Sequence, residues 1–223
     1  APEFDRIAGE LEPVELPRGT SFNDADPSIP RYFRFMTSGL ATIGQPAGDG
    51  TIHDVAFVGR EGGLGLEFVL GRRAPDMHSR IRVGGAALRM PADRLLAEFR
   101  RGDGLQASLL AFTRRLMVQI TTNAGCARFH AAPQRVSNLV LQAVVRLGLG
   151  SEWPVTSEEM ALMLAMDQQE TDGALDDLQE AGLIHRTRGS VRVDDPRALR
   201  ARACACAQDL DPELLRRLAP SAV

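Results

Sequence analysis

The pattern of hydrophobic and polar positions divides the chain near residue 90. Between residues 11 and 90, short runs of extended character alternate with turns rich in glycine and proline. The runs are RYFRFM, ATIG, TIHDVAFV, HSRIRV and AALRM, and the turns are LPRGT, QPAGDGT, GREGG and GRRAPD. Many short strands with frequent turns are typical of a compact barrel or roll. We therefore predict an N-terminal antiparallel β-roll.

Helical spacing replaces this pattern after Pro91, a residue suited to the first turn of a helix. The segment ADRLLAEFRR predicts a short helix, and a long amphipathic helix is predicted from about residue 105 to residue 130. One apolar stripe of the long helix has a spacing of three or four residues and consists of Leu105, Leu109, Phe112, Leu116 and Ile120. Such a stripe is typical of a coiled-coil seam, and we predict that it forms a homodimer. The alternative is that the stripe packs on the β-roll of the same chain.

The segment after residue 130 predicts further helices. The first begins near Pro133, which favours a helix start, and ends at Gly148. Thr156 and Glu159 have the spacing of a capping box, which marks the start of the next helix. This motif predicts a helix from residue 157 to about residue 164.

Another helix is predicted from about residue 168 to residue 180, and Gly182 ends it. Two short strands, in LIHRTRG and SVRVDD, lie on either side of Gly189 and predict a β-wing. Helix, turn, helix and wing make a winged helix-turn-helix, and a helical tail is predicted from Pro196 onward. The chain is thus predicted to be an α+β protein with a β-roll at 1–104, a dimerisation helix at 105–130 and a winged helix-turn-helix domain at 131–223.

Composition indicates an ordinary globular protein. The 223 residues are 44% hydrophobic and 25% charged, and the formal net charge is −3. The sequence contains no apolar run of the roughly 18 residues that a membrane span needs, and its N-terminal segment does not resemble a secretory signal. Three cysteines are too few for a disulfide framework and suit a reducing compartment. We expect a cytoplasmic protein with no membrane partner.

The sequence contains no motif of an enzyme. It has no serine-elbow motif and no paired-carboxylate signature, and its glycine-rich turn GREGGLG lacks the spacing of a phosphate-binding loop. We predict that the protein is not an enzyme and has no catalytic residues.

Cys126 and His130 are four residues apart on the long helix, and Cys204 and Cys206 add two more soft ligands. These side chains could in principle complete a tetrahedral zinc site. The alternative is that the cysteines are small buried apolar residues, and nothing in the sequence brings the second pair near the first. We favour the alternative and predict no metal and no cofactor. The other histidines, which show no ligand spacing, are His53, His78 and His185.

Several stretches resemble the Crp/Fnr family of bacterial transcription regulators over nearly the whole chain. They are ELEPVELPRGT, VAFVGREGGLGL, AALRMPADRLLAEFRR and LQEAGLIHRTRGSVRV, which lie in the family's order. The resemblance implies a cyclic-nucleotide-binding-like β-roll (a double-stranded β-helix), a dimerisation helix and a winged helix. It also implies a homodimer that binds a two-fold symmetric DNA operator and contacts RNA polymerase.

The effector motif of the family is altered. Members that bind a cyclic nucleotide have a Gly-Glu pair that holds the ribose and an arginine that neutralises the phosphate. Alignment through Gly65 places Leu66 at the glutamate and Asp76 at the arginine, where it repels a phosphate. We therefore expect no cAMP binding, although a shifted alignment would bring in Arg72, Arg73 or Arg80. Oxygen-sensing relatives bind an iron-sulfur cluster through cysteines near the N-terminus, and this chain has none before Cys126.

The recognition-helix motif is altered too. In DNA-binding members a glutamate and a later arginine of this helix bind base edges, and Gly173 takes the place of that arginine here. Gln168 and Gln169 occupy the first two positions, Thr171 the buried one, and Asp172 faces outward. Glutamine can pair with adenine through two hydrogen bonds. The predicted contacts to DNA are Gln168, Gln169 and Asp172 on the helix, and Arg186, Arg188 and Arg192 on the wing, with Arg135 as a further cation.

Charge works against this interface. Between residues 151 and 184 there are nine acidic residues and no basic one. Phosphate contacts come chiefly from arginine and lysine, so an acidic helix is a poor match for DNA. Two hypotheses follow. In one, the protein binds an operator weakly or in an unusual way; in the other, its acidic winged-helix surface binds a regulatory protein instead.

Overall fold

The computed structural model describes most of the chain, namely residues 2–23, 31–48, 51–71, 77–148 and 150–209. The chain divides into two compact units, residues 1–117 (unit 1) and residues 118–223 (unit 2). No helix of the described residues is long and apolar enough to cross a membrane.

Unit 1 contains two four-stranded sheets in which all strand pairs are antiparallel. The first sheet has the order β1-β8-β3-β6, with β1 at Glu12–Leu16, β3 at Tyr32–Met36, β6 at Gly63–Leu64 and β8 at Gly85–Pro91. The second has the order β2-β7-β4-β5, with β2 at Ser21–Asn23, β4 at Leu40–Pro46, β5 at Ile52–Val58 and β7 at His78–Val83. The predicted antiparallel β-roll is confirmed.

The interior of the roll is apolar. Phe33 on β3 lies opposite Met90 on β8, and both side chains are fully buried. Gly63 is needed beside them, because a Cβ there would lie 2.5 Å from the Phe33 ring. One ion pair, between Asp54 of β5 and Arg82 of β7, lies largely out of solvent. Burying an aromatic and aliphatic core of this kind is the main source of stability in such a unit.

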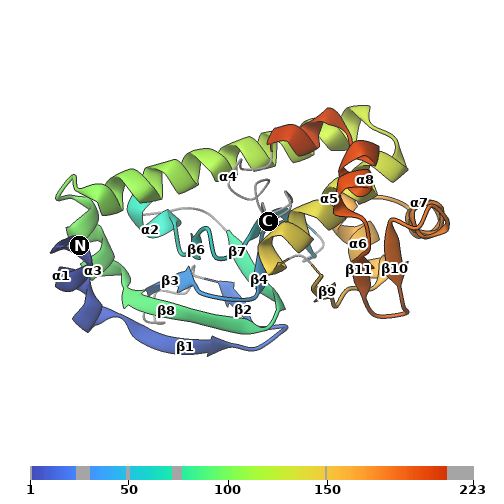
Figure 1. Ribbon diagram of the computed structural model, residues 1–223. Coiled ribbons are helices and arrows are strands. Elements are labelled where there is room, and N and C mark those ends of the chain that lie inside the picture. Colours follow the sequence, from blue (N-terminus) through green and yellow to red (C-terminus); the bar gives the residue numbers. More distant parts are fainter. Residues whose placement is uncertain (1, 24–30, 49–50, 72–76, 149, 210–223) are drawn as a thin grey trace, which may run out of the picture. The chain divides into compact units, whose positions relative to one another are not determined.

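Helices accompany the sheets of unit 1 (Figure 1). They are α1 (Pro2–Ile7), a 3-10 turn (Ala8–Glu10), α2 (Glu67–Leu70), α3 (Ala92–Phe99) and the first part of α4 (Gly104–Phe129). Arg6 of α1 forms ion pairs with Glu98 at 3.3 Å and Asp103 at 2.6 Å. The short helix predicted after Pro91 and the long helix predicted from about residue 105 correspond to α3 and α4.

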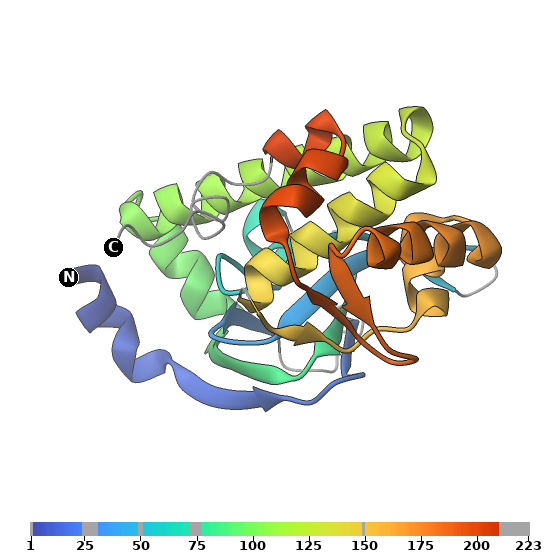
Figure 2. The same cartoon turned by 45° about the vertical axis from the view of Figure 1, so that its right-hand side comes forward.

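Unit 2 begins within α4 and contains the winged helix. Its elements are α5 (Ala132–Leu147), β9 (Glu152–Trp153), α6 (Ser157–Leu164), α7 (Gln168–Glu180), β10 (Ile184–Arg186), β11 (Val191–Val193), α8 (Pro196–Arg202) and a 3-10 helix (Ala205–Asp209). The strands form one antiparallel sheet in the order β10-β11-β9, of which β9 was not predicted. The predicted helix-turn-helix and wing are confirmed, and Figure 2 shows α7 beside the strands of the wing. Only the beginning of the predicted helical tail falls within the described residues.

Local capping sets the bounds of the two helix-turn-helix elements. The Thr156 hydroxyl accepts a hydrogen bond from the Glu159 backbone N–H at 3.1 Å, and the Glu159 carboxylate accepts one from the Thr156 N–H at 3.0 Å. This is the predicted capping box. Ala165 then adopts a left-handed conformation with φ of 47°, which turns the chain between α6 and α7. Asp167 caps α7 by accepting from the backbone N–H of Gln169 at 2.8 Å.

Candidate nucleic-acid interface

Helix α7 presents its first turn to solvent. Gln168 and Gln169 are exposed, as contact with a base edge would require. Thr171 is fully buried, and its hydroxyl donates to the Asp167 carbonyl at 3.0 Å. The prediction that Thr171 takes the buried position is confirmed. With Thr171 facing inward, the two glutamines at the start of the helix face solvent.

Gly173 lies on the same exposed side of α7. A Cβ built on it would meet nothing within 4 Å. The position therefore has room for a long side chain, and neither a crowded neighbour nor a special backbone angle requires glycine there. A glycine inside a helix is destabilising by about 1 kcal/mol relative to alanine, so it gives no local advantage.

Arg186 on β10 joins the wing to α7 through two ion pairs. Its Nη1 lies 3.1 Å from Asp172 Oδ1, and its Nη2 lies 2.8 Å from Asp176 Oδ1. Its backbone N–H also donates to Gln179 Oε1 at 2.9 Å. The guanidinium predicted to bind a DNA phosphate thus lies between two carboxylates of the recognition helix. These ion pairs neutralise part of the acidic surface. They also hold the Arg186 guanidinium away from a DNA phosphate.

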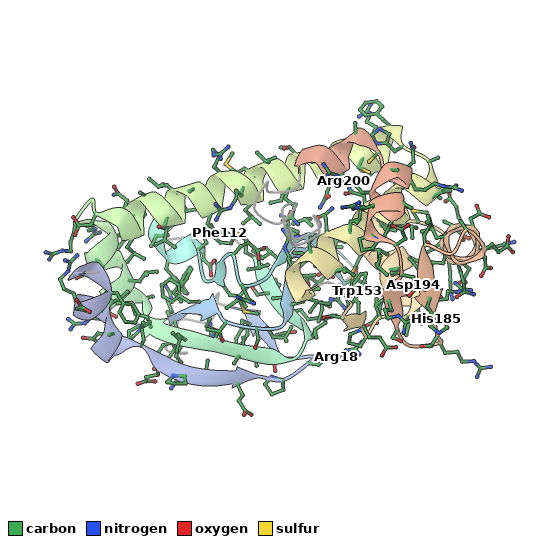
Figure 3. The ribbon with its side chains drawn as sticks, in the orientation of Figure 1. Arg18, Phe112, Trp153, His185, Asp194 and Arg200 are labelled. Atoms are coloured by element: carbon green, nitrogen blue, oxygen red, sulfur yellow. The ribbon has the colours of Figure 1, made fainter. Side chains whose placement is uncertain are left out.

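The other predicted cations differ in their surroundings. Arg192 on β11 pairs with Asp194 at 3.0 Å, and Figure 3 shows Asp194 on the wing. Arg188 is exposed between the wing strands. Arg135 on α5 donates to the Leu164 carbonyl at the end of α6, so this guanidinium takes part in packing of the helix-turn-helix. Arg188 is therefore the wing cation that carries no ion pair among the described residues.

Acidic side chains of α7 outnumber these cations. Glu170, Asp177 and Glu180 are exposed, and none of them forms an ion pair with another described residue. Carboxylates repel phosphates, and the repulsion is strongest where water is displaced from an interface. The exposed surface of α7 therefore combines two glutamines that can bind bases with several charges that oppose DNA.

In unit 1 the aligned effector position offers no carboxylate. Leu66 is only 2% exposed, and Asp76, Arg72 and Arg73 lie outside the described residues. Arg80 lies half-buried on β7. A cavity of about 170 Å³ lies elsewhere in this unit, lined by residues that include Phe33, Met36, Arg60, Leu109 and Phe112. This volume is smaller than the roughly 300–1,000 Å³ of ordinary ligand pockets.

The apolar stripe of α4 is buried within the chain. Leu109, Phe112 and Leu116 are each less than a tenth exposed, while Leu105 and Ile120 are half-buried. Phe112, shown in Figure 3, lies so close to Gly62 that a Cβ on the glycine would be 2.1 Å from its ring. Packing within the chain therefore accounts for these three side chains without a second copy. On the opposite side of the helix, Leu110 is 48% exposed and Met117 is 63% exposed.

A group of three cysteines and one histidine gathers at one end of unit 2. Cys126 and Cys204 are buried, and their Sγ atoms lie 3.4 Å apart. Cys206 Sγ lies 3.6 Å from His130 Nδ1. The expectation that nothing brings the second pair of residues near the first is wrong, because the packing of α8 against α5 returns the chain to the end of α4.

Burial dominates the chemistry of these thiols. It raises the pKa of Cys126 to about 12, with a further contribution from the hydrogen bond and charge of Cys204. Burial also raises the pKa of Cys206. Both thiols are therefore protonated at neutral pH unless a cation replaces the protons.

Known proteins are similar to this chain in sequence. Residues 134–202 match the family described as the Crp-like helix-turn-helix domain. The CRP-like cAMP-activated global transcriptional regulator of Mycobacterium tuberculosis strain H37Rv is 27% identical over 205 residues, which are 88% of this chain and 90% of that protein.

Solved structures share the fold. FixK2 from Bradyrhizobium japonicum superposes with a TM-score of 0.71 at 15% identity, over 87% of this chain and 98% of that one. The CRP-family regulator TTHB099 from Thermus thermophilus superposes with a TM-score of 0.66 at 18% identity, over 85% of this chain and 96% of that one. The matching domain, the relative along most of the chain and the shared fold together make this chain similar to Crp/Fnr-type transcriptional regulators, with a Crp-like helix-turn-helix domain at residues 134–202.

Proposed function

We propose that the protein is a homodimeric, cytoplasmic transcription regulator that binds an operator weakly through α7, with Gln168 and Gln169 as base contacts and no arginine at position 173. The exposure of Gln168 and Gln169 at the capped start of α7 carries this proposal. Contact with RNA polymerase belongs to the proposal through the family. Binding of cAMP does not, because Leu66 stands where a ribose-binding carboxylate is expected.

The contacts available to DNA limit its affinity. Gln169 can bind adenine through two hydrogen bonds, a contact that discriminates by about 1–3 kcal/mol against a wrong base. Arg188 can reach a phosphate, whereas Arg186 would first have to leave Asp172 and Asp176. Few phosphate contacts mean little counterion release. We therefore expect an operator affinity well below that of relatives with an arginine at position 173.

A selection of binding sites from random duplex DNA tests the proposal, followed by fluorescence anisotropy on the selected sites. We expect enrichment of a two-fold symmetric site with adenine at the position facing Gln169. The variant Gln169→Ala should lose the preference for that adenine. Gln179→Ala is the matched control, because Gln179 lies at the other end of α7 and accepts a hydrogen bond from the wing. No enrichment at low salt would contradict operator binding.

A second function is favoured by the unpaired acids of α7. Glu170, Asp177 and Glu180 form an exposed acidic surface, which suits a basic protein partner better than DNA. In this hypothesis, chromatin precipitation recovers no specific sites, and co-purification from the same cells recovers a basic protein. Asp177→Arg together with Glu180→Arg should then abolish capture of that partner. Unchanged capture would remove this hypothesis.

We propose that the homodimer uses the exposed side of α4 instead of the buried stripe. The positions on this side alternate at spacings of three and four, which is the coiled-coil repeat. They are Ala107, Leu110, Arg114, Met117, Thr121 and Ala124, and all are exposed. Sedimentation of the double variant Leu110→Glu with Met117→Glu should give a monomer. Leu162→Glu on α6, a leucine of unit 2 that is 66% exposed, should leave the dimer intact. A dimer that survives the double variant would contradict this interface.

A further inference from the structure

The four soft side chains of unit 2 come from two distant segments. Cys126 and His130 lie one turn apart at the end of α4, where the His130 backbone N–H donates to the Cys126 carbonyl at 3.1 Å. Cys204 lies two residues after the end of α8, and Cys206 lies in the 3-10 helix Ala205–Asp209. Both Figure 1 and Figure 2 show α8 beside the last turns of α4, and Figure 3 marks this region with Arg200.

Their ligand atoms converge on one point. One atom from each residue lies within 4.8 Å of the corresponding atom of every other residue. In a tetrahedral zinc site, bonds of about 2.3 Å to sulfur and 2.0–2.1 Å to nitrogen place neighbouring ligand atoms about 3.6–3.8 Å apart. The observed Sγ–Sγ distance of 3.4 Å and Sγ–Nδ1 distance of 3.6 Å are close to these separations. Small side-chain adjustments would therefore complete the tetrahedron.

We propose that Cys126, His130, Cys204 and Cys206 bind one Zn²⁺ ion in a closed tetrahedral site with three thiolates and one imidazole. Three thiolates and a histidine are a common ligand set of structural zinc. Ligand atoms this close together suit one ion, since a cluster of several irons would hold its ligands farther apart. The site is separate from α7 and does not depend on whether the protein binds DNA.

The surroundings of the cluster agree with a metal site better than with ordinary packing. Asn138 of α5 is buried and donates its amide to Cys126 Sγ at 3.8 Å, as outer-shell groups do toward metal-bound thiolates. Ordinary packing of cysteines as small apolar residues explains neither the half-buried imidazole nor the amide aimed at the sulfur. A Cys126–Cys204 disulfide would use two of the four residues and leave the contact of Cys206 with His130 without a role.

A closed site of this kind would stabilise unit 2. All four coordination positions come from the protein, which is typical of structural rather than catalytic zinc. The ion would tie the end of α4 to the segment that follows α8, and so hold that segment in place. Binding a metal to the folded state alone raises stability by an amount that grows with the metal concentration.

Metal analysis of the full chain tests the site. The protein, purified under reducing conditions and exchanged into zinc-containing buffer, should retain about one Zn²⁺ per chain after desalting. Titration of the metal-free protein with Co²⁺ should give the visible d–d bands of a tetrahedral ion and a thiolate charge-transfer band in the near ultraviolet. Chelation of zinc should lower the melting temperature of unit 2.

Variants of the two half-buried ligands separate metal binding from folding. His130→Ala and Cys206→Ser should each weaken metal affinity by more than the roughly 10- to 100-fold expected for loss of an outer-shell group, and should change the cobalt spectrum. His185→Ala is the matched control, because His185 is exposed on the wing and lies outside the cluster. A reduced protein that binds neither ion would overturn the proposal, as would unchanged affinity and spectra in both ligand variants.

Discussion

The two sides of α7 differ in what they do for the protein. The inner side, made of Thr171, Ala174, Leu175 and Leu178, is buried against unit 2, where α7 packs on α5 and α6. The outer side carries two glutamines, a glycine and most of the acids, and its ion pairs go to Arg186. Folding therefore depends on the inner side, and the proposed recognition would depend on the outer side. A helix-turn-helix can keep its fold while the surface that faces DNA changes its chemistry.

The strongest test of this separation is a substitution on the inner side. Leu178 is fully buried, so Leu178→Ala should lower the free energy of unfolding by about 2–5 kcal/mol. The loss combines the lost burial of the leucine with the cavity that remains. Urea unfolding measures this loss of free energy. The control is Asp177→Ala, because Asp177 is exposed and its replacement should change the free energy of unfolding by no more than about 0.5 kcal/mol. Equal effects of the two substitutions would show that α7 has no distinct inner side.

An arginine on the outer side should act on recognition instead. Gly173→Arg places a guanidinium in open space, at the position that the resemblance aligns with the guanine-binding arginine of the family. A bidentate arginine–guanine contact is worth about 1–3 kcal/mol, so affinity for an operator with guanine at that position should rise roughly 5- to 150-fold per half-site. Fluorescence anisotropy at constant salt measures the change. Affinity that stays the same would mean that this side of α7 does not enter the major groove.

Local sequence signals predicted the two helices of the helix-turn-helix well. The capping box of Thr156 and Glu159 acts within a few residues, and the predicted bounds of α6 and α7 agree with those observed. Strand β9 escaped prediction because it has two residues and becomes a strand only by pairing Trp153 with Val191 of β11. The amphipathic stripe of α4 likewise predicts an apolar face, but the spacing alone does not say what covers it.

Contacts between distant residues could not be predicted in this way. Cys126 and Cys204 are separated by 78 positions, and their contact depends on how α5 and α8 pack. The pairing of Arg186 with Asp172 and Asp176 depends on the return of the wing alongside α7. Residue types and spacing pointed to the wing cations, and they raised a zinc site at the cysteines and His130 that was not favoured from the sequence alone. Only the fold could show that these four side chains converge and that Arg186 already has partners.

Gly173→Ala separates helix stability from charge. Alanine fits the open space at this position, and the more favourable helix propensity should raise the free energy of unfolding by about 1 kcal/mol. DNA affinity should stay within about twofold of the parent protein, because the methyl group brings no donor. Chemical unfolding and anisotropy on the same preparations check both expectations. Affinity that rises with alanine as much as with arginine would show that rigidity of α7, not charge, limits recognition.

The smallest expected effect on stability comes from the ion pairs of Arg186, which join the wing to the outer side of α7. The pairs of Arg186 with Asp172 and Asp176 are partly exposed, with side-chain exposures of 24%, 36% and 54% for the three residues in that order. Exposed pairs contribute about 0–1 kcal/mol, so a double-mutant cycle of Arg186→Ala with Asp176→Ala should give a coupling energy within that range that shrinks as salt is added.

The same cycle also reports on recognition. If Arg186 stays with the acids when DNA is present, Arg186→Ala should change operator affinity less than Arg188→Ala does, because Arg188 is the wing cation without a described acidic partner. A coupling energy of zero together with a larger loss of affinity for Arg186→Ala would mean that the cation leaves α7 for a phosphate. Asp172 and Asp176 would then face DNA without a neutralising cation. The outer side of α7 would repel the phosphates more strongly than it does with these ion pairs in place.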